Sequence, residues 1–477
     1  MMNKYDGAEK SYSMTPTSSI RDSSLKTSVS IERDIKLDPL SIFYSLREQF
    51  PGESFLLESV EGTRKTSRYS FIGVDPISVF KSRRGLIDID GDARKVDDPY
   101  LSLRSYFESI NCGASELAPF SGGMVGYVGY GVVRYFEGIK EPESIDGSPP
   151  DIYFVVPRHL ICVDHLNSQT LVISHGEMST IKEALAKARP APQLELSIGE
   201  GRSNTSKDEY ERMVSSAKES ILDGEIFQVV LSRRTDFTVR GDPFEMYRGL
   251  RQLNPSPYLF YLDFGQLQLL GSSPEMLVRL EGTKLTTRPL AGTRPRSADP
   301  EEDEKLKLDM LLDEKERAEH IMLVDLHRND MGKVSRFGTV KVNELMSVEK
   351  YSHVQHIVSN VESELSEDKD AFDALRAAFP AGTVTGAPKV RAMEIISSLE
   401  KSPRGPYGGA VGYFDFTGNM DVAITIRSIV VSGNNASVQA GAGIVADSVP
   451  EREYAETEHK MGAMIQAIAS AKRREGA

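Results

Sequence analysis

The chain of 477 residues contains no tryptophan and only two cysteines, Cys112 and Cys162. Two cysteines cannot build a disulfide framework or a CxxC-type zinc site, which indicates a reducing compartment. No run of about 20 apolar residues is present, so we expect no membrane-spanning helix, and the first residues lack the pattern of a secretory signal. Basic residues are in deficit, with 57 Lys and Arg against 70 Asp and Glu, which disfavours nucleic acid or an anionic membrane as a partner. A cytoplasmic enzyme or binding protein remains.

The composition is that of a globular protein, with 39% hydrophobic and 27% charged residues. Residues 1–28 are rich in Ser, Thr and charge, and we expect them to form a loose leader. Residues 188–206 are rich in Pro, Gly, Ser and Asn without periodicity, which predicts a linker. The chain is therefore expected to hold an N-terminal domain over 29–187 and a second domain over 207–477.

Short strands joined by tight turns, with helices in separate blocks, predict an α+β fold with mostly antiparallel sheets. Ser206 and Glu209 form a capping-box pattern that predicts a helix over about 207–222, and residues 299–330 are strongly helical and charged in pattern. GGMVGY (122–127) and GGAVGY (408–413) share five of six letters. They are either two similar bulged strands or a duplicated sheet element, and the sequence does not decide between these.

Two Glu-x-x-Glu pairs are the strongest candidate site, namely Glu316 with Glu319 and Glu453 with Glu456. The i, i+3 spacing places both carboxylates of a pair on one helix face. Two such faces opposed would form an all-oxygen cage that suits Mg²⁺ better than zinc. Two solvated acidic faces are the alternative, although the apolar run HIMLVDL beside the first pair favours a partly buried helix.

A second candidate is an anion site. Gly441 and Gly443 directly follow a strand, where backbone N–H groups can approach a carboxylate. Arg427 on a neighbouring strand offers a planar fork for a carboxylate, with an ordinary salt bridge as the alternative. Lys460 lies four residues after Glu456, on the same helix face. The segment also matches a dinucleotide fingerprint, but too few residues follow it for a doubly wound sheet.

Two further loops, PLAGTRPR (289–296) and PAGTVTGAPK (380–389), are rich in Gly and Pro and are equally consistent with structural turns. Single polar residues, each by itself more typical of core or surface, complete the candidates: Gln228, Glu275, His356 and Tyr407. No Ser/His/Asp or Cys/His nucleophile set is recognisable. The chain is therefore not expected to hydrolyse glutamine by itself.

With these residues assembled, the chain resembles the chorismate-utilising enzymes, and among them most closely the large subunits of anthranilate synthase. The resemblance covers about residues 30–470. It rests on motifs that occur in the family's order: GEIFQVVLSRR, GSSPEML, RPLAGTRPR, ERAEHIMLVDLHRND, PAGTVTGAPK, GGAVGY and AGAGIVADSVPEREYAET. It implies large, mostly antiparallel sheets packed as a sandwich with flanking helices, and Mg²⁺ as the cofactor.

The resemblance also implies roles for individual residues. Glu319 and Glu456 correspond to direct Mg²⁺ ligands, with Glu316 and Glu453 acting through water. The residues implied in substrate binding are Gly292, Thr293, Tyr407, Arg427, Gly441, Ala442 and Gly443, of which Arg427 and Tyr407 meet the enolpyruvyl carboxylate. The implied catalytic positions are Gln228, Glu275, His356, Thr383 and Lys460. Glu275 corresponds to the general acid that protonates the departing 4-hydroxyl.

Two positions select a branch of the family. Gln228 stands where isochorismate and salicylate synthases have the lysine that activates water, which favours ammonia as the nucleophile. Ala291 stands where aminodeoxychorismate synthases carry a lysine that bonds to C2. The implied reaction converts chorismate and ammonia to anthranilate and pyruvate, the first step of tryptophan biosynthesis. The alternatives are a 4-amino-4-deoxychorismate synthase component I and a regulatory binding protein without turnover.

Two segments resemble those that bind tryptophan in feedback-inhibited members of the family. They are Leu57, Glu58 and Ser59 in the expected N-terminal domain and Pro257, Tyr258 and Leu259 in the second domain. The alternative for these segments is a core strand and a turn. Since no glutaminase segment is recognisable, a separate glutamine amidotransferase subunit (component II) is expected to supply the ammonia.

Overall fold

The computed structural model describes residues 27–32, 35–59, 68–110, 112–113, 117–142, 147–351 and 354–473. The expected leader lies outside these residues except for its last two, and β1 (Ser28–Glu32) begins at Ser28. All strand pairs among the described residues are antiparallel. The prediction of an α+β fold with mostly antiparallel sheets is confirmed.

The strands form two layers that share the long strands β3 and β7. The first layer runs, in order of hydrogen-bonded neighbours, through β1, β8 (Gln169–Ser174), β7 (Ile152–Asp164), β3 (Tyr69–Arg83), β2 (Ser54–Glu58), β12 (Tyr258–Phe264), β13 (Leu267–Ser273), β22 (Ser428–Ser432), β23 (Asn435–Ile444) and β11 (Gln228–Gly241). Three short strands also pair with β11: β9 (Leu196–Ile198), β10 (Arg202–Ser203) and β19 (Gly386–Ala387).

The second layer continues from the other halves of β3 and β7. It runs through β5 (Asp92–Lys95), β4 (Leu86–Ile89), β3, β7, β6 (Gly123–Val128), β20 (Ala410–Asp415), β21 (Met420–Ile424), β14 (Met276–Glu281), β15 (Lys284–Thr287) and β18 (Val354–Glu364). Strands β16 (Leu290–Pro295) and β17 (Lys341–Lys350) pair with β18.

The corner between the layers lies in β3, where the register with β7 shifts between Pro76 and Ser78. Asp75 there has a φ of 56°, and such an irregularity lets a strand pass from one sheet to another. Alternate side chains of strands in both layers then meet in one apolar core, as Phe260 of β12 and Tyr413 of β20 do. The expected sandwich is therefore present.

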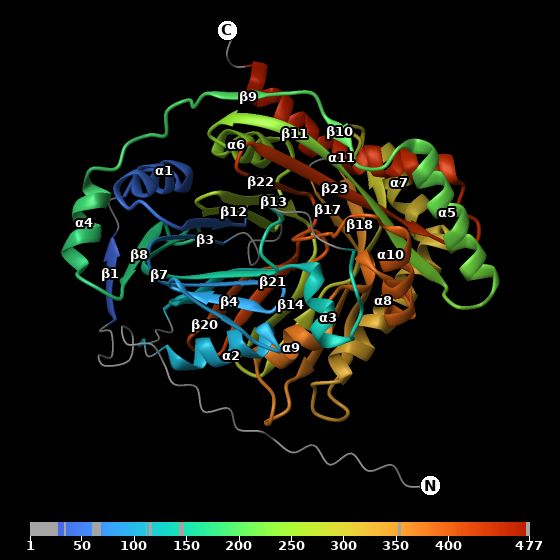
Figure 1. Ribbon diagram of the computed structural model, residues 1–477, viewed down its shortest axis with the longest axis horizontal. Coiled ribbons are helices and arrows are strands. Elements are labelled where there is room, and N and C mark those ends of the chain that lie inside the picture. The colour runs from blue at the N-terminus through green and yellow to red at the C-terminus, as the bar shows by residue number, and fades with distance from the viewer. Residues whose placement is uncertain are drawn as a thin grey trace.

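Helices cover the outer faces of both layers (Figure 1). The first layer is covered by α1 (Pro39–Gln49), α4 (Met178–Ala186), α6 (Phe244–Leu253) and α11 (Pro450–Arg473), and the second by α2 (Pro99–Ser109) and α9 (Ala371–Ala378). Near β11, β23, β16 and β18 lie α5 (Lys207–Leu222), α10 (Lys389–Leu399), α7 (Pro300–Leu312) and α8 (Glu314–Gly332). The short elements are η1 (Tyr130–Val132), α3 (Val133–Phe136) and η2 (Gly382–Val384).

Local sequence signals explain several of these boundaries. Ser206 and Glu209 form the expected capping box, and α5 begins at Lys207. The helical prediction over 299–330 is confirmed, with one break: Asp313 ends α7, and its carboxylate caps the N-terminus of α8. This break matters, because it sets the direction of the helix that carries Glu316 and Glu319.

The two similar glycine-rich segments turn out to be direct neighbours. β6 pairs antiparallel with β20, and Gly126 lies opposite Gly412. One segment comes from the expected N-terminal domain and the other from the second domain, so hydrogen bonds of the second layer cross that expected boundary. The same is true of the first layer, where β2 pairs with β12. The division into two domains with a linker over 188–206 stays a prediction.

Candidate active site

A cavity of about 710 Å³ lies at the β11–β23 end of the sandwich. Gln228 of β11 and Gly441 and Gly443 of β23 line it from the first layer, and Gly292 and Thr293 of β16 line it from the second. The N-terminal turns of α8 and α11 complete its wall. Fifteen of the sixteen residues expected in the catalytic, substrate and metal sites line this one cavity, and Ala442 is the exception.

The two acidic pairs converge on the cavity. Glu316 and Glu319 lie in the first turns of α8, and Glu453 and Glu456 lie in the first turns of α11. Burial raises the pKa of Glu319, and the neighbouring Glu316 raises it further. Burial raises the pKa of Glu453 likewise, with a further contribution from Glu456. These shifts mark negative charge that nearby cations do not fully compensate.

The donor set fits Mg²⁺ in its chemistry. Only carboxylate oxygens are offered, which Mg²⁺ prefers, and the ion keeps several waters and needs only one or two protein carboxylates. Among the described residues, no three His, Cys, Asp or Glu side chains are close enough together to hold a metal ion. Glu316 is paired with Arg294 at 3.1 Å, and Glu456 with Lys460 at 2.7 Å. An ion bound here would replace these pairings.

Glu275 lies in the turn between β13 and β14, and its side chain is 4% exposed. Its Oε1 atom has no hydrogen-bond partner among the described residues. Burial raises the pKa of Glu275 to about 8, against smaller opposing effects of Thr383, the backbone of Leu290 and Lys460. A carboxyl with this pKa is mostly protonated at neutral pH, so it can donate a proton to a leaving group.

Arg427 lies between β21 and β22 with a φ of 51°, a conformation uncommon outside glycine. Its Nη1 donates to the backbone oxygen of Lys460 at 3.2 Å, and it makes no ion pair within the described part of the chain. Tyr407 lines the same cavity, and burial raises its pKa to about 12. A guanidinium without a carboxylate partner beside a protonated phenol is well suited to bind a carboxylate.

Gly443 makes room for the amide of Gln228. A Cβ at position 443 would lie 2.5 Å from Gln228 Nε2, so the end of the Gln228 side chain would have to move. That amide donates to Glu319 Oε1 at 3.1 Å. The glycine therefore leaves room for the Gln228 amide to lie against one of the cavity carboxylates.

Gly441 and Ala442 face opposite sides of β23, because side chains alternate along a strand. Position 441 faces the cavity, and its carbonyl oxygen accepts a hydrogen bond from Lys460 Nζ at 3.0 Å. The Ala442 side chain is fully buried on the opposite face, in the apolar cluster that includes Ala392 of α10 and Val214 of α5. Ala442 therefore does not line the cavity, although the resemblance implied that it would.

Gly292, Thr293 and His356 are joined at a bulge. Between Ala291 and Thr293 the register of β16 with β18 shifts, and Gly292 has a φ of 64°. His356 Nδ1 lies 2.9 Å from the carbonyl oxygen of Gly292 and 3.0 Å from Thr293 Oγ1. Because the carbonyl only accepts, Nδ1 carries the proton. Burial lowers the pKa of His356, which keeps the ring neutral.

Thr383 lies in η2, and its buried Oγ1 atom has no hydrogen-bond partner among the described residues. Gln228 Oε1 and Glu275 Oε1 share this property and line the same cavity. Buried polar atoms are rarely left without partners in folded proteins. Their concentration around one cavity indicates a polar ligand that supplies the missing hydrogen bonds.

Sequence reasoning missed several residues of the cavity wall. The polar ones are Asn254, Ser256, Lys315, Gln439 and His459. Ser256 falls in NPSPYLF, a motif that the resemblance assigns to the effector site. The hairpin pattern offered a partial signal, because Tyr258 pairs with Ser273 and so brings the segment before β12 to the same end of the hairpin as Glu275.

The six residues expected in the tryptophan site line a second cavity of about 140 Å³. It lies where β2 and β12 pair, with Glu58 opposite Leu259. Aromatic side chains form part of its wall, namely Tyr69, Phe71, Tyr258 and Tyr413. Glu58 is already bonded to Arg251, at 2.9 Å between Oε2 and Nε. The structure brings both segments together around a small, partly aromatic pocket, and tryptophan as its ligand stays a prediction.

Comparisons with known proteins define the family. Residues 52–466 match the chorismate binding enzyme family. Anthranilate synthase component 1 of Acetivibrio thermocellus is 45% identical over 461 residues, covering 91% of this chain and 93% of the relative. The same component of Methanothermobacter marburgensis is 47% identical over 440 residues, covering 90% and 93%. The structure of anthranilate synthase component I from Streptococcus pneumoniae superposes with a TM-score of 0.76 at 38% identity, covering 83% and 92%.

The two-layer antiparallel fold is thus shared with an anthranilate synthase component I. The chain belongs to the chorismate binding enzyme family. The resemblance to the large subunits of anthranilate synthase is confirmed. Of the helices in the described residues, none combines the length and apolar content that crossing a membrane requires.

Proposed function

We propose that this protein converts chorismate and ammonia to anthranilate and pyruvate in the cytoplasm, as the first step of tryptophan biosynthesis. The names of its relatives support the reaction, and the observation that carries it is Glu275. This carboxyl is buried in the cavity, its Oε1 is unpartnered within the described residues, and its pKa is raised to about 8. It therefore suits a proton donor to the departing 4-hydroxyl.

The two carboxylates of chorismate meet two different sets of residues. Arg427 and Tyr407 bind the enolpyruvyl carboxylate through charge and hydrogen bonding. Glu319 and Glu456 would hold Mg²⁺ directly, with Glu316 and Glu453 acting through water. When bound, the ion supplies positive charge that holds the ring carboxylate and stabilises charge shifting towards it.

Gln228 and Ala291 select the nucleophile and its route. The amide of Gln228 has no basicity with which to deprotonate water, so ammonia adds at C2 as the more reactive nucleophile. Ala291 has no amine that could bond to C2 first, which favours direct amination. As the new C–N bond forms, the C4–O bond breaks and Glu275 gives its proton to the leaving oxygen. Loss of pyruvate with the C2 proton then makes the ring aromatic.

The name component 1 of the relatives implies a second component. We propose that a glutamine amidotransferase subunit delivers ammonia to the cavity. We further propose that tryptophan binds the pocket formed by Leu57, Glu58 and Ser59 with Pro257, Tyr258 and Leu259. It would inhibit by favouring a form that binds chorismate more weakly.

Product identification tests the proposed reaction. The purified chain is given chorismate, Mg²⁺ and excess ammonium, and the products are separated and identified by mass. Fluorescent anthranilate with one equivalent of pyruvate is expected. An aminated product that still carries its enolpyruvyl group would instead assign the chain to 4-amino-4-deoxychorismate synthesis.

The Glu319→Gln variant tests the cation site in the same assay. It should lose Mg²⁺-dependent turnover while its circular dichroism spectrum stays that of the parent, because an amide is a poor ligand for a hard cation. Glu344→Gln, an exposed change on β17, serves as the control. Full Mg²⁺-dependent activity of Glu319→Gln would remove this residue from the metal site.

A further inference from the structure

One short segment, Asn254–Leu259, lies between the catalytic cavity and the effector pocket. Asn254, Pro255 and Ser256 line the catalytic cavity of about 710 Å³. Pro257, Tyr258 and Leu259 line the pocket of about 140 Å³. Two prolines flank Ser256 and fix the φ angles at both neighbouring positions. A shift of the segment at one cavity is therefore carried to the other over very few bonds.

Ser256 has a buried hydroxyl that nothing in the proposed mechanism uses. Its side chain is 3% exposed and lines the catalytic cavity. Its Oγ atom has no hydrogen-bond partner among the described residues. Tyr258 pairs with Ser273, so the segments that hold Ser256 and Glu275 both leave the strand pair at this end. Glu275 Oε1, Gln228 Oε1 and Thr383 Oγ1 also line the cavity without a partner among the described residues. Buried polar groups that lack partners and line one cavity call for a polar ligand, and Ser256 is the one that lies on the segment shared with the second pocket.

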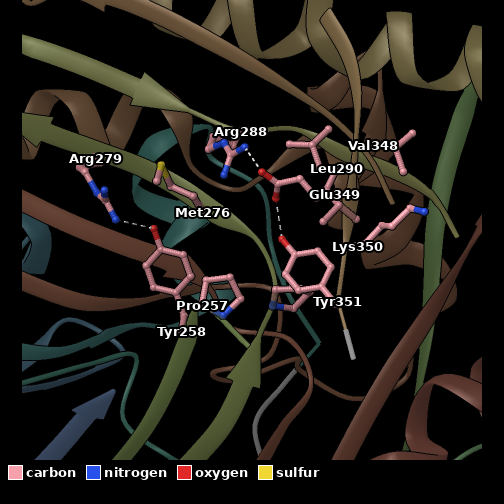
Figure 2. Close-up of a pocket in the computed structure, with 12 residues that line it drawn as sticks. Pro257, Tyr258, Met276, Arg279, Arg288, Leu290, Val348, Glu349, Lys350 and Tyr351 are labelled. Atoms are coloured by element: carbon pink, nitrogen blue, oxygen red, sulfur yellow. Dashed lines mark hydrogen bonds and ion pairs between the residues drawn. The ribbon is translucent and has the colours of Figure 1, made fainter. Parts of the chain in front are cut away.

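A third cavity, of about 300 Å³, shares lining residues with both others, and Figure 2 shows it. It shares Pro257 and Tyr258 with the effector pocket and Pro274, the neighbour of Glu275, with the catalytic cavity. In Figure 2, Tyr258 is bonded to Arg279 on one side of this space. Protein interiors are otherwise close-packed, so this space leaves the segment room for a second position.

We propose that the Ser256 hydroxyl bonds to the 4-hydroxyl of the substrate, beside Glu275, and that occupancy of the effector pocket weakens this contact by shifting the segment Asn254–Leu259. The inference rests on the proposed substrate and effector. It adds a substrate-contacting residue and a route for the inhibition. Ser256 binds the oxygen that departs, and Glu275 protonates it.

The Ser256→Ala variant of the full chain tests the contact by equilibrium binding. Calorimetric titration with chorismate and Mg²⁺, without ammonium or glutamine, should show a Kd raised about tenfold, the usual cost of one lost hydrogen bond to a ligand. The meta-(carboxyvinyloxy)benzoate analogue keeps both carboxylates but lacks the 4-hydroxyl. Its Kd should be the same for the variant and the parent.

Ser82→Ala is the matched control. Ser82 of β3 is 1% exposed, its Oγ also lacks a partner within the described residues, and it lies outside the three cavities. Its variant should bind chorismate like the parent. Equal weakening by both serine variants, or weaker binding of the analogue by Ser256→Ala, would overturn the contact. So would a chorismate Kd of Ser256→Ala within twofold of the parent.

The effect of tryptophan on chorismate binding tests the proposed route through the segment Asn254–Leu259. In the parent, saturating tryptophan should raise the Kd for chorismate by a measurable factor. In Ser256→Ala this factor should be closer to one. The Kd for tryptophan, measured without chorismate, should be the same in both proteins. An unchanged factor would overturn the route. A parent chain that forms anthranilate from chorismate yet fails these tests refutes this inference alone. A parent that forms no anthranilate refutes the proposed function first.

Discussion

At the scale of single residues, burial gives ordinary side chains unusual properties. Burial raises the pKa of Glu275 to about 8. Burial and neighbouring carboxylates raise the pKa values of Glu319 and Glu453. The other two acids form ion pairs, Glu456 with Lys460 and Glu316 with Arg294. The cavity thus combines a carboxyl that is mostly protonated at neutral pH, Glu275, with carboxylates paired to Arg294 and Lys460, and carboxyl groups in such different environments suit different roles.

The first prediction concerns proton donation. Since the acid form of Glu275 is the active one, kcat should fall as the pH rises through about 8, the value to which burial raises its pKa. Glu275→Gln should lower kcat by a factor on the order of 10² to 10⁴ and remove this alkaline decline. Anthranilate fluorescence in a pH series measures both, with exposed Glu344→Gln as the control. A parent kcat that is flat across pH 8 would contradict the assignment.

At the scale of secondary-structure elements, close approaches hold the site together. The ladder between β11 and β23 sets Gln228 over Gly443. Beneath the cavity, Arg404 donates to the carbonyl oxygens of Val230 and Val384 at 2.8 and 2.7 Å, and it is paired with Glu400 at 2.6 Å. These bonds join β11, η2 and the end of α10.

The second prediction is that Gly443→Ala disables the site without unfolding the protein. The added Cβ would lie 2.5 Å from Gln228 Nε2, so the amide must leave Glu319 Oε1. Turnover of chorismate should fall at least about tenfold, as loss of a charge-assisted hydrogen bond does. Gly462→Ala in α11 meets open space and should retain activity. Parental kinetics for Gly443→Ala would mean that the amide position is unimportant.

The third prediction concerns the ion pair of Arg404 and Glu400, which are 4% and 7% exposed. Arg404→Met leaves a buried carboxylate without its partner, so the free energy of unfolding should fall by about 3 to 5 kcal/mol. Urea denaturation followed by circular dichroism measures it. Arg391→Met, which breaks an exposed pair with Glu225, should leave the unfolding curve nearly unchanged. Equal losses in both variants would refute the special role of burial.

At the scale of the whole molecule, strands far apart in the sequence build both cavities. The effector pocket requires β2 beside β12, and the catalytic cavity requires β11 and β23 opposite β16. The two cavities remain distinct, although Asn254–Leu259 touches both. This arrangement permits a ligand in one cavity to change binding in the other without competing for the same space.

The fourth prediction uses this separation. Ser59→Leu should fill part of the pocket of about 140 Å³ and raise the tryptophan concentration for half-inhibition by about tenfold or more, since overpacking a small site costs over 1 kcal/mol. The rate without tryptophan should stay near that of the parent. Inhibition curves at fixed chorismate measure both, with Ser216→Leu on the exposed face of α5 as the control. Unchanged inhibition would place the effector elsewhere.

Much of this could be predicted from local patterns. The capping box at Ser206 follows from a few neighbouring residues, because helix caps are set locally. The i, i+3 spacing likewise placed each acidic pair on one helix face. The break at Asp313 was missed because Glu, Lys and Leu on both sides favour helix equally.

The sequence by itself determined the kinds of elements, the antiparallel pairing and the chemical types available to the site. Only the tertiary structure decided that Ala442 faces away, that Ser256 reaches the cavity, and that Glu275 stays protonated near neutral pH. Propensity and alternation depend on near neighbours along the chain. Burial, charge pairing and shared cavities depend on residues hundreds of positions apart, whose distances exist only once both layers have packed.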